Sequence, residues 1–387
     1  MFDRKRMHMI ALTMIFILAL SGCAREEAVY TPSEQHEGEN AEETPEYQQK
    51  LAMVEPEDYT SVYGLDLEAG STISVIGKSA SDEFWDELKR GAKQAQDDIN
   101  AYLGYEGEDQ IKVNYSGATV ADSVDEQVNI LDEELARYPV AIAIAISDTK
   151  SCEVQFDLAG ENGIPIVAVD SSNEYAGIVA SIETKNKESG TFVAEQLAED
   201  ISGEGEVVIF TNNVSSQSIA SRLKGFRTTL KEYEGITHVR IVNLDNQDKL
   251  RAYYAKGNGL DTEKDAEELE ALSLEELVDY LFESMPDTKA VFATDDDATE
   301  YALATVKRLG ADVKVYGYDA DREEIEALKN GEIAGLIVQN PFGMGYAAVV
   351  AAARASLGMA NEGYVNTGYK WVTAENVDSE EIQAILY

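Results

Sequence analysis

The sequence predicts an α/β protein whose parallel sheets form two similar lobes. From residue 71 onward, short apolar runs alternate with amphipathic helical patterns, which is the order expected of α/β architecture. The run "VAIAIAI", residues 140–146, is apolar at every position, as is typical of a central parallel strand covered on both faces. Roughly ten such strands are more than one sheet usually holds, and they fall into two series. We therefore expect two lobes of similar construction.

The first series of elements begins with the strand "TISVIG", residues 72–77, and the helix that follows it. A second strand, "IKVNY", also precedes a helix, and "VAIAIAI", "IPIVAVD" and "IVASI" come next. Both helices carry apolar residues at helical spacing. These positions are Phe84, Leu88, Ala92, Ala95 and Ile99 in the first helix, and Val124, Val128, Leu131 and Leu135 in the second.

The second series repeats the pattern with the strands "EVVIF", "HVRIV", "KAVFA", "VKVYGYD" and "AGLIVQ". Ser273 and Glu276 have the spacing of a capping box that opens the helix "SLEELVDYLFESM". The acidic stretch 253–271 is expected to be an excursion on the surface. Another helix of this series is marked by Ile219, Leu223, Phe226 and Leu230.

The N-terminus predicts export. A basic head of Arg4, Lys5 and Arg6 precedes the apolar run "MIALTMIFILAL" and then "LSGC", which ends at Cys23. This pattern is typical of a secretory signal over residues 1–22; an uncleaved anchor would leave the last four residues unexplained. "LSGC" looks like a bacterial lipobox, which implies that Cys23 receives diacylglycerol and an acyl chain such as palmitate. We expect a lipoprotein on the extracytoplasmic face of the cell membrane.

Residues 23–70 are predicted to form an acidic flexible tether, because "REEAVYTPSEQHEGENAEETPEYQQK" has no sustained apolar period. With Cys23 lipidated, Cys152 has no cysteine with which to pair, and we expect no intramolecular disulfide. Cys152 is interpreted as a small residue at a helix start.

Composition excludes several classes of function. The chain has 73 Asp and Glu against 31 Lys and Arg, a formal charge of −42, which argues against nucleic acid or an anionic lipid surface as partner. The histidines, His8, His36 and His238, lie in the signal, the tether and a strand, so histidine-based catalysis is not expected. There is no Walker loop and no GxGxxG motif opening a helix. We therefore predict no enzyme, no cofactor and no metal.

The residues that directly follow the strands predict the position of a binding site. In open α/β sheets, ligands bind beyond the carboxyl ends of the strands. Nearly all residues at these places are polar, which suits a neutral polar ligand better than a phosphate. They are residues 78–85, 147–148, 170–171, 211–216, 243–248, 294–297, 319 and 339–340.

Two of these loops are rich in carboxylate and amide groups without the pattern of a calcium loop. Asp295, Asp296 and Asp297 are consecutive rather than alternating, and "NLDNQD" lacks a well-spaced glycine and glutamate. We expect Asp296 or Asp297 to cap the following helix and Asp295 to face the cleft.

The order of these loops resembles the type I periplasmic binding proteins, in particular the ribose-binding-like sugar receptors of ABC importers. The resemblance covers residues 71–372, and a repressor with the same lobes would carry a helix-turn-helix where this chain has the lipobox. The fragments that carry it are "SDEFWDELKRGAK", "GIPIVAVDSS", "ASRLKGF", "AVFATDDDATEYAL", "VYGYDAD" and "AGLIVQNPFGMGYAAV".

The resemblance implies two Rossmann-like lobes with parallel sheets, joined by a three-crossing hinge. The N-terminal lobe is expected to comprise residues 71–183 and 342–368, and the C-terminal lobe residues 187–338 and 372–387. The hinge crossings are expected near residues 184–187, 339–341 and 368–372.

The resemblance also implies a set of ligand contacts. Phe84 and Trp85 match the aromatic pair that packs on the sugar ring. Two positions depart from the family toward acidity: Asp82 and Asp295 stand where amides are common, and Ser171 stands where an arginine often follows Asp170. Asp296 matches the second residue of the family's Asn-Asp pair. The full set of expected ligand-binding residues is Asp82, Phe84, Trp85, Asp170, Arg222, Asp295, Asp319 and Gln339.

Arg222 is the obvious cation of this set, so the pocket is predicted to be more acidic than a ribose pocket. Crowded carboxylates repel one another, which suggests a ligand with an amine, or a cation that accompanies a neutral sugar. The alternative is that some of these aspartates cap helices or face solvent.

These expectations describe a monomeric, membrane-anchored extracytoplasmic receptor that closes around a sugar or sugar derivative and delivers it to an ABC permease. A receptor that hands its closed form to a sensor kinase or a chemoreceptor is an alternative from another class. A carbohydrate-acting enzyme is a third.

Overall fold

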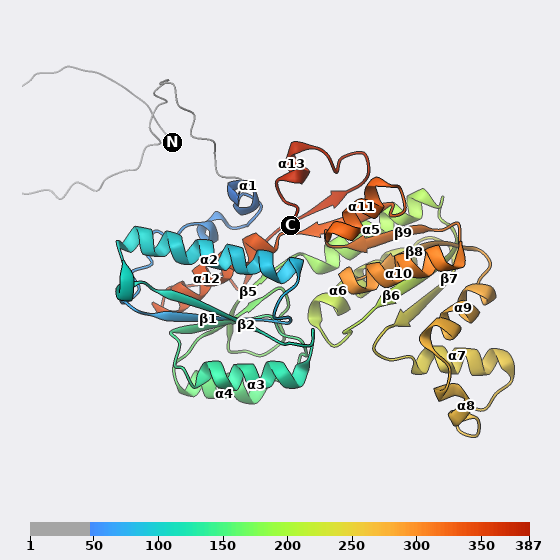
Figure 1. The fold of residues 1–387 in the computed structure, drawn as a ribbon, viewed down its shortest axis with the longest axis horizontal. Helices are drawn as coiled ribbons and strands as arrows, with labels where there is room; N and C mark the ends of the chain where they lie inside the picture. Colours follow the sequence, from blue (N-terminus) through green and yellow to red (C-terminus); the bar gives the residue numbers. More distant parts are fainter. Residues whose placement is uncertain (1–46) are drawn as a thin grey trace, which may run out of the picture. The chain divides into compact units, whose positions relative to one another are not determined.

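A computed structural model describes residues 47–387, which fold around two six-stranded sheets (Figure 1). The predicted signal of residues 1–22 and the predicted lipidation at Cys23 lie outside the described residues. Among the described helices, none is long and apolar enough to cross a membrane.

The sheet of the N-terminal lobe has the strand order β11-β5-β4-β3-β1-β2, and all of its neighbouring strands are parallel. The strands are β1 (Thr72–Gly77), β2 (Lys112–Gly117), β3 (Ala141–Ile144), β4 (Ile166–Val169), β5 (Ile178–Glu183) and β11 (Tyr364–Asn366).

Helices cover both faces of this sheet. One face packs against α2 (Glu83–Leu103) and α12 (Pro341–Ser356), and the other against α3 (Val124–Leu135) and α4 (Glu153–Glu161). Figure 1 shows α2 on one side of β1 and α3 and α4 on the other. The helices α2 and α12 approach closely, because a Cβ atom at Gly345 would lie 1.9 Å from the Leu88 carbonyl oxygen. Cys152 is buried at the start of α4, as an inert small residue would be.

The sheet of the C-terminal lobe has the corresponding order β12-β10-β9-β8-β6-β7. Its pairs are parallel except at one edge, where β12 runs antiparallel to β10. The strands are β6 (Glu204–Thr211), β7 (Gly235–Asn243), β8 (Thr288–Ala293), β9 (Lys314–Tyr318), β10 (Gly335–Gln339) and β12 (Tyr369–Val372).

One face of the second sheet packs against α5 (Asn186–Asp200) and α6 (Gln217–Leu230). The other face is covered by α7 (Asp248–Asn258), α9 (Leu274–Ser284), α10 (Asp296–Leu309), α11 (Arg322–Lys329) and α13 (Glu380–Gln383). The predicted excursion 253–271 contains the end of α7 and the short α8 (Ala266–Glu270), and Ser273 and Glu276 form the predicted capping box of α9.

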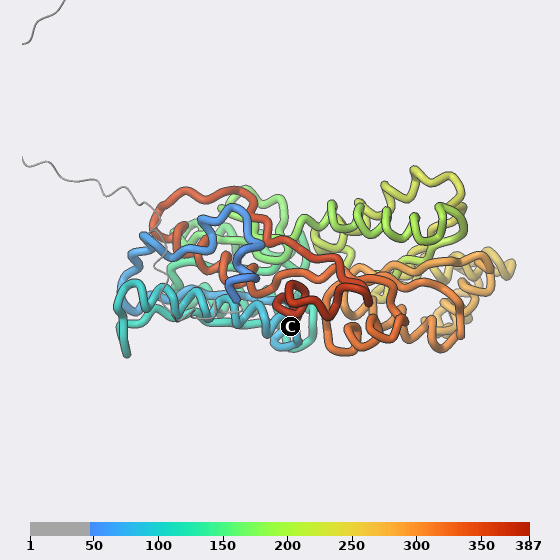
Figure 2. The backbone as a smooth tube through the Cα atoms, turned by 90° about the horizontal axis from the view of Figure 1, so that it is seen from above, coloured from blue at the N-terminus to red at the C-terminus, as the bar shows by residue number. Residues whose placement is uncertain are grey.

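The chain passes between the two sheets three times: between β5 and α5, between β10 and α12, and between β11 and β12 (Figure 2). Hydrogen bonds join these crossings. Thr184 Oγ1 donates to Gln339 Oε1 at 2.9 Å, and Asn340 Nδ2 donates to the Thr367 carbonyl oxygen at 3.0 Å. The predicted α/β class with two lobes is confirmed, and these crossings are the connections that lobe movement would bend.

The predicted tether is wrong for its last part. Residues 47–70 contain α1 (Tyr47–Leu51) and the 3-10 helix η1 (Glu57–Thr60), and they pack on the N-terminal lobe. Tyr59 has 1% of its surface exposed, and its hydroxyl donates to Asn361 Oδ1 at 3.2 Å. The apolar residues here are isolated and irregularly spaced, so they form no period that a sequence pattern can reveal. Those buried in the lobe are Leu51, Val54, Tyr59, Leu65 and Leu67.

Candidate functional site

A cavity of about 380 Å³ lies at the carboxyl ends of the strands and is lined by residues of both lobes. The N-terminal lobe contributes residues from the segments that follow β1, β2 and β4. The C-terminal lobe contributes residues from the segments that follow β6, β8 and β9, and Gln339 from the end of β10. The lining consists of Lys78, Ser79, Ser81, Asp82, Phe84, Trp85, Thr119, Ala121, Asp122, Asp170, Asn212, Asn213, Ser218, Ile219, Arg222, Asp295, Asp296, Asp297, Glu300, Asp319, Asp321 and Gln339.

The structure brings all eight predicted ligand-binding residues to this one cavity: Asp82, Phe84, Trp85, Asp170, Arg222, Asp295, Asp319 and Gln339. Sequence reasoning did not single out Lys78, Asp122, Asn213 or Asp321. Lys78 and Asn213 lie within strand-end segments, and Asp122 lies in the loop after β2. Applying the strand-end rule to every strand would have found Asp122 as well.

The first turn of α2 forms the aromatic wall of the cavity. Asp82 caps the helix, since its Oδ1 accepts a hydrogen bond of 2.8 Å from the Trp85 backbone N–H. Phe84 and Trp85 each have 7% of their surface exposed, and their rings meet edge to face with centroids 5.1 Å apart. Burial raises the pKa of Asp82. The cap therefore fixes both the rings and one carboxylate at the cavity.

Asp170 follows β4 in a left-handed conformation, with φ of 60°, and its N–H donates to the Ile182 carbonyl oxygen at 2.9 Å. Its Oδ2 lies 2.8 Å from Lys78 Nζ, and both side chains are buried. Lys78 also donates to Ser216 Oγ of the opposite lobe at 3.1 Å. The prediction that Arg222 is the cation of the pocket is therefore incomplete, because Lys78 contributes a second positive charge after the first strand. Ser171 turns away, and its hydroxyl donates to the Ile146 carbonyl oxygen at 2.6 Å.

Asp319 follows β9 with the same backbone geometry, with φ of 76° and an N–H that donates to the Ile337 carbonyl oxygen at 2.8 Å. Its Oδ1 accepts hydrogen bonds from Gln339 Nε2 at 2.8 Å and from the Tyr387 hydroxyl at 2.9 Å. Burial raises the pKa of Asp319, and the nearby Arg222 guanidinium opposes this shift.

Arg222 is buried beneath the cavity, with 2% of its surface exposed, and its guanidinium lies 4.2 Å from the ring centroid of Tyr318. Each of its three nitrogens donates a hydrogen bond. Nε donates to Asn186 Oδ1 at 2.8 Å. Nη1 donates to the Thr294 carbonyl oxygen at 2.7 Å, and Nη2 donates to Gln339 Oε1 at 2.8 Å. Arg222 thus positions Gln339 and the end of β8 while it supplies positive charge below the pocket.

The expectation for the three consecutive aspartates is wrong in one respect. Asp295, not Asp296 or Asp297, caps α10, because its Oδ1 accepts from the Ala298 N–H at 3.0 Å. Its Oδ2 accepts from Thr294 Oγ1 at 2.7 Å, and burial raises its pKa to about 6. The residue that caps a helix is the last extended residue before the first helical one. Among three consecutive aspartates, a sequence pattern cannot tell which one holds that place. Asp296 and Asp297 occupy the first helical positions and also line the cavity.

Negative charge dominates the cavity on the side of the C-terminal lobe. Asp295, Asp296, Asp297, Asp319 and Asp321 all come from that lobe. Burial, with repulsion from Asp319, raises the pKa of Asp296, and the same two causes raise the pKa of Asp321 to about 7. Within residues 47–387, no cluster of three or more His, Cys, Asp or Glu side chains has an arrangement that could hold a metal ion.

Three hydrogen bonds connect the lobes around the cavity. Besides the Lys78–Ser216 bond, Asn213 Nδ2 donates to Asp122 Oδ1 at 2.6 Å, and the Arg322 N–H donates to Glu83 Oε2 at 3.0 Å. Movement of the lobes about their crossings would break these bonds.

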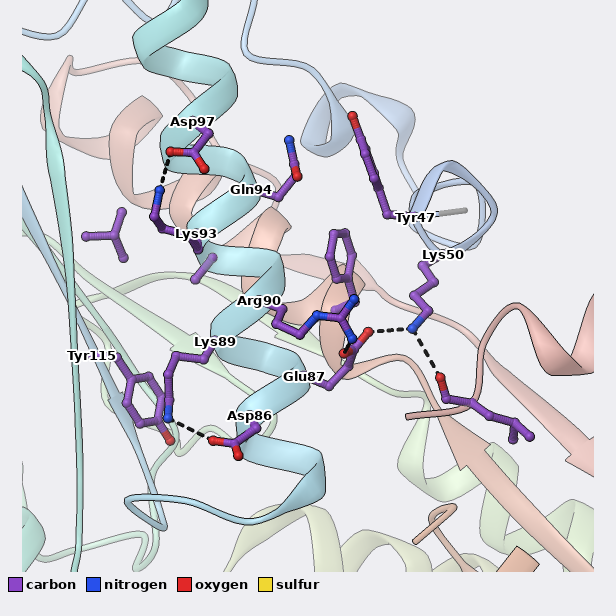
Figure 3. A pocket seen from close by; sticks show the side chains of 14 residues that line it. Tyr47, Lys50, Asp86, Glu87, Lys89, Arg90, Lys93, Gln94, Asp97 and Tyr115 are labelled. Carbon is purple, nitrogen blue, oxygen red and sulfur yellow. Dashed lines mark hydrogen bonds and ion pairs between the residues drawn. The ribbon is translucent and has the colours of Figure 1, made fainter. Parts of the chain in front are cut away.

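A larger hollow of about 850 Å³ lies along the outer side of α2, beside α1 (Figure 3). Its charged side chains pair with one another: Lys89 with Asp86 at 2.8 Å, Arg90 with Glu87 at 2.6 Å, and Lys50 with Glu87 (Figure 3). It is lined by none of the predicted ligand-binding residues. The strand-end cavity is therefore the stronger candidate for the binding site.

Comparison with known proteins identifies the family. The model of a periplasmic binding protein domain matches residues 73–359. The ribose import binding protein RbsB of Salmonella typhimurium is 25% identical over 279 residues, which are 70% of this chain and 80% of that protein. The RbsB of Bacillus subtilis is 24% identical over 55% of this chain and 61% of its own length. A putative rhizopine-binding protein of Rhizobium meliloti is 24% identical over 66% of this chain and 78% of its own.

Solved structures share the fold. An ABC transporter solute-binding protein from Agrobacterium vitis, bound with α-D-tagatopyranose, superposes with a TM-score of 0.68 at 22% identity over 82% of this chain and 99% of that one. A carbohydrate transporter solute-binding protein from Agrobacterium radiobacter, in complex with D-arabinose, has a TM-score of 0.65 at 27% identity. The match covers 83% of this chain and 100% of that one. The family model matches residues 73–359, which are most of this chain, and the chain therefore belongs to the type I periplasmic binding proteins.

Proposed function

We propose that this protein is an extracytoplasmic solute-binding receptor that closes its two lobes around one sugar or sugar derivative and delivers it to an ABC importer. The observation that carries the proposal is the convergence of the eight family-matched residues on one cavity between the lobes. Two of the relatives named above are ribose import binding proteins, and the two solved structures hold α-D-tagatopyranose and D-arabinose, which supports the same class of ligand.

The chemistry of the cavity suits a sugar. Carboxylate and amide groups such as Asp170, Asp319 and Gln339 hydrogen-bond hydroxyl groups, while the apolar face of a sugar ring packs on the rings of Phe84 and Trp85. Ligand entry requires the lobes to separate about their three crossings, which breaks the bonds of Lys78, Asp122 and Glu83 across the cavity. Closure re-forms these bonds around the ligand.

Membrane anchoring through Cys23 is part of the proposal and rests on the lipobox-like "LSGC". Cells that express the Cys23→Ala variant should incorporate no labelled fatty acid into the protein, whereas Cys152→Ala should be labelled like the wild type. Labelled Cys23→Ala protein would contradict the anchor.

Ligand binding is tested by thermal denaturation of the purified protein with a panel of pentoses, hexoses and amino sugars. A ligand at 100 times its Kd adds about 2.7 kcal/mol to the free energy of unfolding, so a true ligand should raise the Tm in a saturable manner. Isothermal titration should then give one site per chain. If no sugar of the panel raises the Tm, the sugar-receptor proposal is wrong.

A further inference from the structure

The strongest unexplained feature of the cavity is a group of carboxylates that have oxygens to which the protein supplies no hydrogen-bond donor. Asp296 is the first residue of α10, Asp319 follows β9, and Asp321 lies two residues further on. All three line the cavity from the C-terminal lobe. They come from two separate loops, so the arrangement is a product of the fold rather than of one acidic stretch.

Asp319 directs an unpaired oxygen at the cavity. The side chain has 4% of its surface exposed, yet its bonds from Gln339 and Tyr387 both end on Oδ1. In residues 47–387, no donor bonds Oδ2 of Asp319 and none bonds the carboxylate of Asp296. Glu324, near both of them, is 1% exposed, and its buried Oε1 has no hydrogen-bond partner in this part of the chain. Asp296 is half-buried and Asp319 is buried at the edge of the cavity, so a closed cavity that excludes water favours a ligand that supplies donors to their oxygens.

The two cations that line the cavity are engaged elsewhere. Lys78 is bonded to Asp170 and Ser216, and each guanidinium nitrogen of Arg222 already donates to a protein oxygen. Within residues 47–387, neither cation therefore forms an ion pair with Asp296, Asp319 or Asp321.

We propose that the ligand carries a protonated amine, as an amino sugar does, and that its ammonium group binds between Asp296 and Asp319. This inference rests on the proposed function and assigns the chemical class of the ligand. An ammonium group offers three donors and no acceptor, which is what these oxygens lack. Hydrogen bonds between charged groups are shorter and stronger than neutral ones.

The electrostatics of the folded protein agree with this assignment. Asp296 is faced by Asp319 and Asp321, and Asp295 and Asp297 stand beside it on the same turn. Burial and this repulsion raise the pKa of Asp296. A cation relieves the repulsion and favours the ionised carboxylates. A divalent metal ion needs several oxygen ligands converging on one point, and the described carboxylates are not arranged in that way.

The first test compares matched sugars that differ in one group: glucose with glucosamine, galactose with galactosamine, and mannose with mannosamine. The full-length purified protein is titrated with each, and the N-acetylated amines serve as neutral controls. We expect at least one amine to bind about ten- to hundredfold more tightly than its hydroxyl counterpart. Because binding ionises carboxyl groups, calorimetry in two buffers of different ionisation heat should detect proton release.

The second test changes the charge without changing the shape. Asp296→Asn should remove most of the preference for the amine and leave the affinity for the hydroxyl sugar unchanged or slightly improved. Asp248→Asn is the matched control, because Asp248 is also the first residue of a helix and does not line the cavity. It should leave both affinities unchanged.

The possible outcomes separate the two proposals. If the protein binds amine and hydroxyl sugars with equal affinity, and Asp296→Asn changes neither affinity, the proposal of an amine-bearing ligand is wrong and the sugar-receptor proposal still stands. Binding of a neutral sugar that is lost in EDTA and restored by Ca²⁺ would assign the acidic group to a metal ion and also overturn the amine. Binding of simple amines without any sugar would refute the sugar receptor and not the cationic site. No binding by any member of the panel would refute both.

Discussion

The two lobes repeat one topology but differ in chemistry where they meet at the cavity. Their sheets have corresponding strand orders, so that β4 in one lobe matches β9 in the other. Asp170 and Asp319 follow these strands with positive φ angles, and the N–H of each bonds an isoleucine carbonyl in the neighbouring strand. The backbone has thus placed a carboxylate at the same point of both lobes.

The surroundings of these two carboxylates differ. Asp170 forms a buried ion pair with Lys78, whereas Asp319 receives neutral donors from Gln339 and Tyr387 and has Arg222 at a greater distance. The N-terminal lobe also contributes the rings of Phe84 and Trp85, while the C-terminal lobe contributes the excess of carboxylates. A repeated fold therefore repeats the positions of side chains and leaves their charge free to vary.

The lobes differ in their edges as well. Residues 47–70 pack against the N-terminal lobe, and the C-terminal lobe has the antiparallel strand β12 where its counterpart has the parallel β11. The residue after Ile182 is Glu183, and the residue after the corresponding Ile337 is Val338. One lobe thus buries a carboxyl group where the other buries an apolar side chain.

The largest expected effect tests how residues 47–70 cover the N-terminal lobe. Tyr59→Ala should lower the free energy of unfolding by about 3–5 kcal/mol, because it removes a buried ring and its hydrogen bonds. Urea denaturation measures this. Tyr63→Ala is the control from the same segment, since Tyr63 is 82% exposed, and it should be nearly silent. If Tyr59→Ala proved as silent as Tyr63→Ala, residues 47–70 would not be part of the folded lobe.

The ion pair of the N-terminal lobe gives the next effect. Lys78→Met leaves Asp170 buried without its partner, and breaking a buried pair in this way costs about 3–5 kcal/mol. The double variant Lys78→Met/Asp170→Leu removes both charges and should recover much of that stability in urea denaturation. A double variant as unstable as the single one would mean that the pair acts through something other than charge.

Trp85 and Trp371 compare the aromatic residues of the two lobes. Trp85→Ala should weaken ligand binding by about 1–3 kcal/mol, because it removes the platform for the ligand, and should also lower the Tm. Trp371, which stacks on Tyr316 with centroids 6.3 Å apart, lies outside the cavity. Trp371→Ala should lower the Tm and keep the affinity. Unchanged affinity in Trp85→Ala, measured by titration, would make Trp85 a core residue only.

The last expected effect concerns pH and the buried Glu183. Burial, with the Asp170 carboxylate nearby, raises the pKa of Glu183 to about 8. The folded state therefore binds this proton more tightly than the unfolded state, so stability falls as pH rises from about 4.5 to about 8, by about 1.4 kcal/mol for each unit of difference in pKa.

Glu183→Gln should flatten this part of the stability profile, because glutamine does not titrate. Glu188→Gln, an exposed position on α5, should keep the slope of the wild type in urea denaturation at each pH. An identical slope in Glu183→Gln and wild type would show that Glu183 is not the group that titrates.

Much of the molecule was determined by the sequence alone. The alternation of apolar runs and helical periods predicts the two lobes, because each parallel strand must be buried on both faces. The residues after the strands predict the cavity, since the carboxyl ends of parallel strands meet at one edge. The set of eight residues from Asp82 to Gln339 is what the resemblance to the sugar-receptor family implies.

The tertiary structure decided what depends on contacts between distant segments. Lys78 and Asp170 are far apart in sequence, so their pairing, and with it the second cation of the pocket, has no local signal. The cover formed by residues 47–70 rests on isolated side chains such as Tyr59, each buried by a different partner and therefore without a period. Asp295 caps α10 because the helix begins at Asp296. Packing sets this first helical residue, and a run of three aspartates gives no sign of which of them it will be. The net charge of the cavity depends on charged residues from both lobes, and only the fold brings these residues together.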